Sequence, residues 1–78
     1  MRKVIFKGLN DKLFGDLSYD VDVICHVMSI GKALDQITFE AEILGSELIT
    51  IIKKFKLDKS LIKQINPENK YILTAYDW

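Results

Sequence analysis

The sequence has a single cysteine, Cys25, so no disulfide can form within the chain. A lone cysteine favours a reducing compartment, and the simplest expectation is the cytoplasm. Long apolar runs are absent as well, and the charged N-terminus is not followed by the apolar segment of a signal peptide. We therefore expect no membrane span.

Motifs that specify a reaction are also missing. The sequence contains no glycine-rich phosphate loop, no context typical of a serine nucleophile and no cofactor motif. The chain has one histidine, His26, beside its one cysteine, so a zinc site of the cysteine/histidine type cannot assemble within one chain. We therefore expect no catalytic residues, no cofactor and no bound metal ion.

What remains is the composition of a folded, globular chain. Hydrophobic residues make up 49% of the 78 residues and charged residues 28%, which is not typical of a disordered segment. A chain of this length is one domain, and it buries only ~60–65% of the surface that its unfolded form exposes, so its core is thin. The net charge is zero, but residues 8–46 are acidic and residues 47–70 are basic. Such asymmetry bears on partners rather than on the fold.

The centre of the chain carries two competing patterns. Alternating apolar and polar positions predict strands at 21–29 and 35–43, joined by a turn at 31–33. The same stretch also has the three-four apolar spacing of one long amphipathic helix. Several β-branched residues, and two glycines that would lie inside that helix, favour the hairpin. A strand at 19–30 followed by a helix at 33–44 is a further alternative.

The rest of the chain has a simpler pattern. Residues 3–8 and 70–78 alternate like strands, and residues 9–18 form a predicted connection. Ser46 is the predicted N-cap of an amphipathic helix, and Asp58 that of a second, shorter one. The expected fold is α+β: a small antiparallel sheet made from the N-terminal strand, the central hairpin and the C-terminal strand, with one or two helices packed on one face.

In the predicted hairpin, the even-numbered face carries acidic side chains around an apolar strip. Like charges directly opposite one another are unfavourable, and water alone, a divalent ion or a basic protein partner could offset them. An apolar strip rimmed by charge is typical of a protein interface. The aromatic residues of the C-terminal AYDW are candidate anchors for such a partner. The predicted partner-binding residues are Asp22, Ile24, His26, Met28, Glu40, Glu42, Tyr76 and Trp78.

The lysine-rich segment IIKKFKLDKSLIKQI resembles a helix-turn-helix. The KYILT that follows is similar to the strand after the recognition helix in Cro-type repressors of phages. This resemblance implies nucleic acid as an alternative partner. No arginine occurs after Arg2, so the commonest bidentate contact to guanine is missing, whereas lysines can bind phosphate without sequence preference. The residues of this alternative are Lys53, Lys54, Lys56, Lys59 and Lys63.

The sequence therefore predicts a small non-enzymatic protein-binding module that acts as a cytoplasmic regulator, inhibitor or immunity-type protein and can form a homodimer. Its bias towards Lys, Ile, Asn and Asp suggests a bacterial or phage origin. A nucleic-acid-binding regulator is the first alternative, and a small metal-dependent enzyme on the acidic sheet face is the second. The hairpin also predicts that Cys25 is buried and reacts slowly, and that Ile24 and Met28 are exposed.

Overall fold

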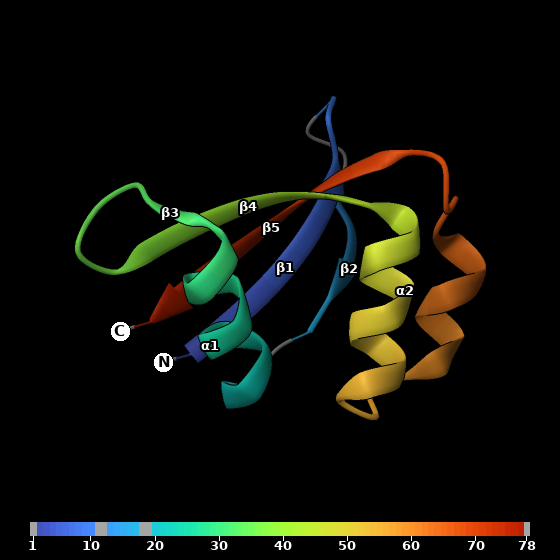
Figure 1. Ribbon diagram of the computed structural model, residues 1–78, viewed down its shortest axis with the longest axis horizontal. Helices are drawn as coiled ribbons and strands as arrows, with labels where there is room; N and C mark the ends of the chain where they lie inside the picture. Colours follow the sequence, from blue (N-terminus) through green and yellow to red (C-terminus); the bar gives the residue numbers. More distant parts are fainter. Residues whose placement is uncertain (1, 11–12, 18–19, 78) are drawn as a thin grey trace.

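The computed structural model describes residues 2–10, 13–17 and 20–77, whose strands form one antiparallel sheet in the order β2-β1-β5-β4-β3 (Figure 1). The predicted α+β class is confirmed. The strands are β1 (Arg2–Gly8), β2 (Leu13–Asp16), β3 (Lys32–Ala33), β4 (Thr38–Leu44) and β5 (Lys70–Asp77). The helices are α1 (Val21–Ile30), α2 (Gly45–Lys54) and the 3-10 helix η1 (Lys59–Gln64).

The last strand, β5, is the centre of the sheet. It pairs with β1 on one side, where Arg2 lies opposite Asp77, and with β4 on the other, where Thr38 lies opposite Tyr76. The start of β1 and the end of β5 are therefore neighbours (Figure 1). Arg2 Nε lies 3.0 Å from Asp77 Oδ1, which ties the first strand to the last.

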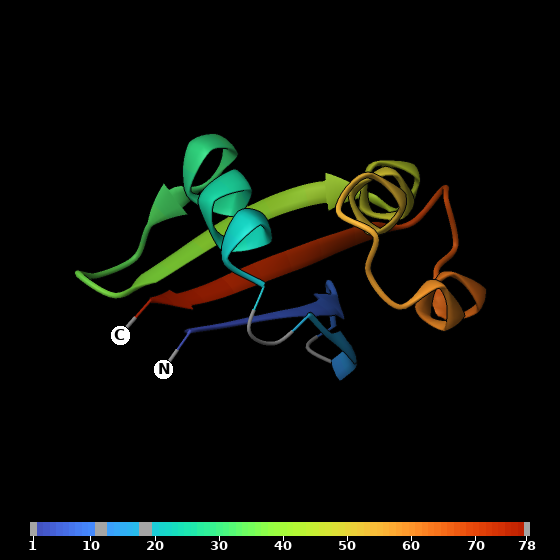
Figure 2. The same ribbon diagram turned by 90° about the horizontal axis from the view of Figure 1, so that it is seen from below.

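Alternation along the strands separates a buried face from an open one. The buried face of β1 and β5 carries fully buried side chains, and α1 lies across it (Figure 2). The helices contribute the other half of the core, and removing each such side chain from water contributes ~1.5–3 kcal/mol. The apolar side chains that are at most 4% exposed are Val4, Phe6, Leu17, Val23, Ile24, Val27, Leu48, Ile51, Ile52, Tyr71, Leu73 and Ala75.

The predicted central hairpin is wrong in its first half, because residues 21–30 form α1 rather than a strand. The carboxylate of Asp20 caps this helix by accepting a hydrogen bond from the backbone N–H of Val23 at 3.1 Å. The side chains of Val23, Ile24 and Val27 share one stripe of the helix and enter the core. This burial outweighs the strand preference of β-branched residues.

The second half of the hairpin does contain a strand, but with different neighbours. β4 lies mostly within the predicted 35–43, and it pairs with β5 and with the short β3 instead of with residues 21–29. Both helical alternatives are wrong too, because α1 ends at Ile30 and residues 38–44 are extended.

Two expectations that depended on the hairpin are wrong with it. Cys25 is exposed rather than buried, and Ile24 is only 2% exposed. The helical period explains both, because it places Ile24 on the stripe of Val23 and turns Cys25 away from the core. Met28 is 37% exposed and lies on the surface, as predicted.

The segment between β1 and α1 and the N-caps of the two later helices were also predicted from the sequence. The connection predicted for 9–18 contains β2, which pairs with β1. Ser46 is not the N-cap of α2: the cap position is Leu44, and no side chain caps it. The predicted cap at Asp58 is confirmed, since its carboxylate accepts a hydrogen bond from the backbone N–H of Ser60 at 3.0 Å.

In the part of the chain that the structure describes, no helix is both long and apolar enough to cross a membrane.

Candidate protein-binding surfaces

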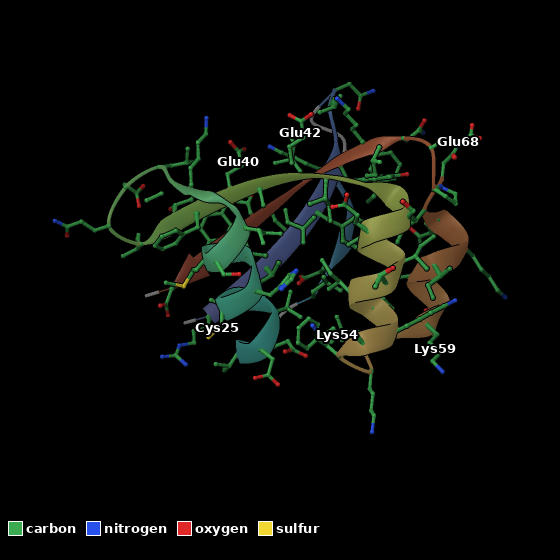
Figure 3. All side chains as sticks on the ribbon, in the orientation of Figure 1. Cys25, Glu40, Glu42, Lys54, Lys59 and Glu68 are labelled. Carbon is green, nitrogen blue, oxygen red and sulfur yellow. The ribbon has the colours of Figure 1, made fainter. Side chains whose placement is uncertain are left out.

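The structure divides the acidic residues that the hairpin would have placed on one face. Asp22 is exposed in the first turn of α1. Glu40 and Glu42 extend from β4 on the side away from α1 and α2 (Figure 3), where the Glu42 carboxylate lies 3.5 Å from Lys70 Nζ. Among the described residues, no three histidine, cysteine or acidic side chains are grouped so that they could hold a metal ion. The shared acidic face on which the metal-dependent alternative rested is therefore not formed.

His26 lies in a groove between α1 and α2. The centroid of its ring is 5.7 Å from that of Phe55, which follows the last turn of α2. Beside it is a hollow of about 330 Å³ that combines apolar walls with one carboxylate and one ammonium group. The side chains that line it come from His26, Ile30, Glu47, Thr50, Ile51 and Lys54. This groove can accept an apolar side chain of a partner molecule, together with a polar group next to it that contacts the charged residues.

Four exposed apolar side chains belong to the stretch from the last turn of α1 to the start of β4, which we call the apolar end and define as Met28, Ile30, Leu34 and Ile37. These four side chains are 37–52% exposed. Seven large apolar side chains are exposed in the described part of the chain, and four of them lie within residues 28–37. Met28 and Ile30 belong to the last turn of α1, and Leu34 and Ile37 belong to the turn between β3 and β4, which lies on the left of Figure 1.

The apolar end is held by local hydrogen bonds. The carboxylate of Asp35 accepts from the backbone N–H groups of Ile37 and Thr38 at 2.8 and 2.7 Å. The backbone N–H of Leu34 donates to the carbonyl oxygen of Thr38 at 2.8 Å, which closes the turn. The hydrogen bond from Ile37, and then that from Thr38, hold the pKa of Asp35 below its ordinary value despite partial desolvation. The turn therefore presents Leu34 and Ile37 in a defined geometry.

A second hollow, of about 350 Å³, lies beside the apolar end along the outer edge of β4. β3 covers this edge only at Phe39 and Glu40, because the chain leaves α1 at Gly31 just before β3 begins. A Cβ atom at Gly31 would lie 2.5 Å from the carbonyl oxygen of Glu40, so glycine permits the close approach. The hollow is lined by Ile30, Gly31, Lys32, Glu40, Ala41, Glu42 and Ile72.

The structure therefore brings together only part of the predicted partner-binding set. Met28 belongs to the apolar end, while Glu40 and Glu42 line the second hollow and His26 lines the first. Ile24 is in the core, and Asp22 lies at the opposite end of α1. Tyr76 is half-buried on the open face of the sheet. Trp78 lies outside the described residues.

The five lysines of the nucleic-acid alternative are all exposed, but they do not lie on a helix-turn-helix. Lys53 and Lys54 end α2, and Lys56 occupies the following turn with a φ of 55°. Lys59 and Lys63 belong to η1, a six-residue 3-10 helix. A recognition helix that enters the major groove is an α-helix, so the resemblance does not extend to the three-dimensional structure. Nucleic-acid binding stays a prediction.

The sequence placed Ile30 in the exposed apolar strip, and it is 49% exposed, but sequence reasoning missed Leu34 and Ile37 as surface residues. The signal available was their position on either side of turn-forming Asp35. The helical pattern assigned both to a buried stripe, and the hairpin assigned Ile37 to its buried face. No protein-family model, curated protein or solved structure matches this chain. The surfaces of the molecule are therefore the guide to what it binds.

Proposed function

We propose that this chain is a small non-enzymatic protein-binding module, a cytoplasmic regulator or inhibitor, and that the apolar end is its partner-binding surface. The observation that supports this most is the exposure of four large apolar side chains on one short, hydrogen-bonded stretch. Contiguous apolar surface on a monomer is typical of an interaction site. Covering these partly exposed side chains contributes roughly 1 kcal/mol each.

The surroundings of the apolar end define the chemistry of the partner. Glu40 and Glu42 lie beside it, along the second hollow. A partner with an apolar centre and a basic rim would match this arrangement, because charges at the rim steer association and exclude wrong partners. Ile30 lines both hollows, so apolar side chains of the partner can enter on either side of it.

A comparison of variants tests this proposal. The full chain is immobilised and exposed to a lysate of cells in which it naturally occurs, and bound proteins are quantified by mass spectrometry. Leu34→Lys places a charge at the apolar end, where Leu34 is 52% exposed, so we expect folding to survive. Lys63→Glu on η1 is the control, because Lys63 is exposed and lies on another element.

We expect one protein to be retained by the wild type and by Lys63→Glu, and to be reduced roughly ten-fold or more with Leu34→Lys, as for a central contact. Thermal unfolding of both variants verifies that the fold is intact. Equal retention by the wild type and Leu34→Lys, or no specific retention by the wild type, would contradict the proposal.

A further inference from the structure

The outer edge of β4 carries backbone groups that point away from β5. In an antiparallel pair, alternate residues exchange hydrogen bonds with one neighbour, and the residues between them direct their N–H and C=O groups to the other side. The backbone N–H of Asp77 donates to the carbonyl oxygen of Ile37 at 2.8 Å, in the register that β4 and β5 continue. The odd-numbered residues of β4 therefore bond to β5, and the even-numbered residues direct their backbone groups to the outer edge.

The short strand β3 uses only the first part of this edge. The backbone N–H of Leu34 donates to the carbonyl oxygen of Thr38 at 2.8 Å, and the pairing ends at Glu40. The next outward-facing residues are Glu42 and Leu44, and no strand lies opposite them in the part of the chain that the structure describes. The N–H groups of these two residues and the carbonyl oxygen of Glu42 are therefore open to a further strand.

The open part of the edge has a hollow on each side. The hollow of about 350 Å³ is lined by three consecutive residues of β4 itself, Glu40, Ala41 and Glu42. Ile30 lines both this hollow and the one between α1 and α2, so the two are adjacent. Successive side chains of a strand point to opposite faces. A strand added to this edge would therefore direct every other side chain towards the helices and the rest towards the open face of the sheet.

We propose that this edge binds an extended peptide segment, in which apolar and basic residues alternate, as an additional antiparallel strand in line with β3. Backbone hydrogen bonds to Glu42 and Leu44 hold the peptide, and its apolar side chains enter the hollow between α1 and α2. When a peptide extends a sheet, the main chain supplies affinity and alternate side chains supply specificity. The carboxylates of Glu40 and Glu42 outnumber the ammonium group of Lys32 in the other hollow, which favours basic residues opposite Glu42.

The size and charge of the edge favour a peptide over a second copy of the chain. Residues 41–44, at ~3.4 Å per residue, give an open edge of ~14 Å, which suits a short segment and not a protein interface of ~800 Å² per partner. Pairing of two β4 edges about Glu42 would place like charges opposite one another, which is unfavourable. The edge strand at the other side of the sheet, β2, has the sequence LFGD and no basic residue.

NMR titration of the full, isotope-labelled chain tests the site. The probe is the synthetic peptide Val-Lys-Val-Lys-Val-Lys-Val, acetylated and amidated at its ends. We expect the amide signals of Glu42 and Leu44 to shift saturably, and that of Lys63 on η1 to stay in place. The proposal does not rest on the proposed function, because the peptide binds the backbone of β4. Leu34→Lys, which disrupts the apolar end, should therefore bind the peptide like the wild type.

Leu44→Pro removes one open N–H group with little strain. Leu44 has a φ of −73° and a ψ of 153°, which proline adopts, and proline is tolerated where the N–H of an edge strand faces solvent. We expect Leu44→Pro to remain folded and to raise the dissociation constant of the peptide roughly ten-fold or more, because a peptide carbonyl loses its donor. Leu44→Ala keeps the N–H, is the matched control, and should bind like the wild type. Thermal unfolding verifies that both variants are folded.

N-methylated peptides test the same bonds without a protein variant. In the proposed register the lysines lie opposite Glu42 and Leu44 and direct their N–H groups to β4, whereas the valine N–H groups face solvent. N-methylation of the lysines should abolish binding, and N-methylation of the valines should not. A wild type whose Glu42 and Leu44 amides do not shift at millimolar peptide would overturn the proposal. So would equal affinities of the two methylated peptides, or the same shifts on concentrating the protein alone, which would make a second copy the occupant.

Discussion

The carboxylate of Asp20 accepts a hydrogen bond from the backbone N–H of Val23 at 3.1 Å, and the side chain of Val23 is fully buried. The cap of α1 and its first core contact therefore lie within one turn. This arrangement begins the helix at Val21 and directs the stripe of Val23, Ile24 and Val27 into the core.

Asp20→Ala should lower the free energy of unfolding by about 1 kcal/mol, because the N–H of Val23 loses its acceptor. Asp20→Asn keeps an acceptor oxygen and should retain most of the stability. Urea unfolding of the three proteins measures the difference. Equal stability of Asp20→Ala and the wild type would show that the cap does not stabilise α1.

Cys25 should react readily with a thiol reagent in the folded protein, because its side chain is exposed on α1. We expect a rate within about ten-fold of that in denaturant, where access is complete. Absorbance of the released leaving group measures this rate, and Cys25→Ser is the blank. A folded protein whose labelling proceeds only through global unfolding would place Cys25 in the core and contradict the helix.

Asp35 should titrate below its ordinary pKa of 3.8, since the N–H groups of Ile37 and Thr38 stabilise its carboxylate. A lowered folded pKa means that the carboxylate stabilises the fold above pH 3.8 and loses this effect as the pH falls through the folded value. NMR titration of the Asp35 side chain and the Ile37 amide gives the midpoint. A midpoint at or above the ordinary value would show that these hydrogen bonds are absent in solution.

Double-stranded DNA should bind weakly to this chain and dissociate near physiological salt. Exposed lysines without a recognition helix contribute mainly the salt-sensitive phosphate contacts. Gel-shift measurements at several salt concentrations provide the check. Sub-micromolar binding at physiological salt that Lys59→Glu with Lys63→Glu abolishes would make nucleic acid the better assignment.

The parts of the fold that the sequence predicts well are those with one unambiguous pattern. Val4 and Phe6 in β1, and Leu73 and Ala75 in β5, alternate with half-buried or polar positions. The helix α1 is not predicted, because its apolar residues satisfy a strand period and a helix period together. Tertiary burial and the Asp20 cap decide between the two, and of these only the possible cap is visible in the sequence.

The candidate surface was predictable only in part for the same reason. Glu40 and Glu42 share one strand face as expected, since this segment is a strand both in the predicted hairpin and in the structure. Leu34 and Ile37 are apolar, and apolar residues are assigned to the core by default. Their exposure follows from the shortness of β3, which ends at Ala33 and leaves the turn beyond the helix layer. The length of β3 depends on where α1 ends in space. The local pattern of apolar and polar residues does not encode that position.

Site-specific photo-cross-linking tests the central claim most directly, because it captures a partner of any identity at a chosen position of the surface. A benzophenone side chain replaces Leu34 at the apolar end in one chain and Gln64 on η1 in a matched control, both at exposed positions. After irradiation in the cells in which the protein naturally occurs, we expect a discrete heavier adduct with another protein from position 34 and none of comparable yield from position 64. Adducts of equal yield from both positions, or an adduct from position 64 alone, would contradict the assignment of the apolar end as the partner-binding surface.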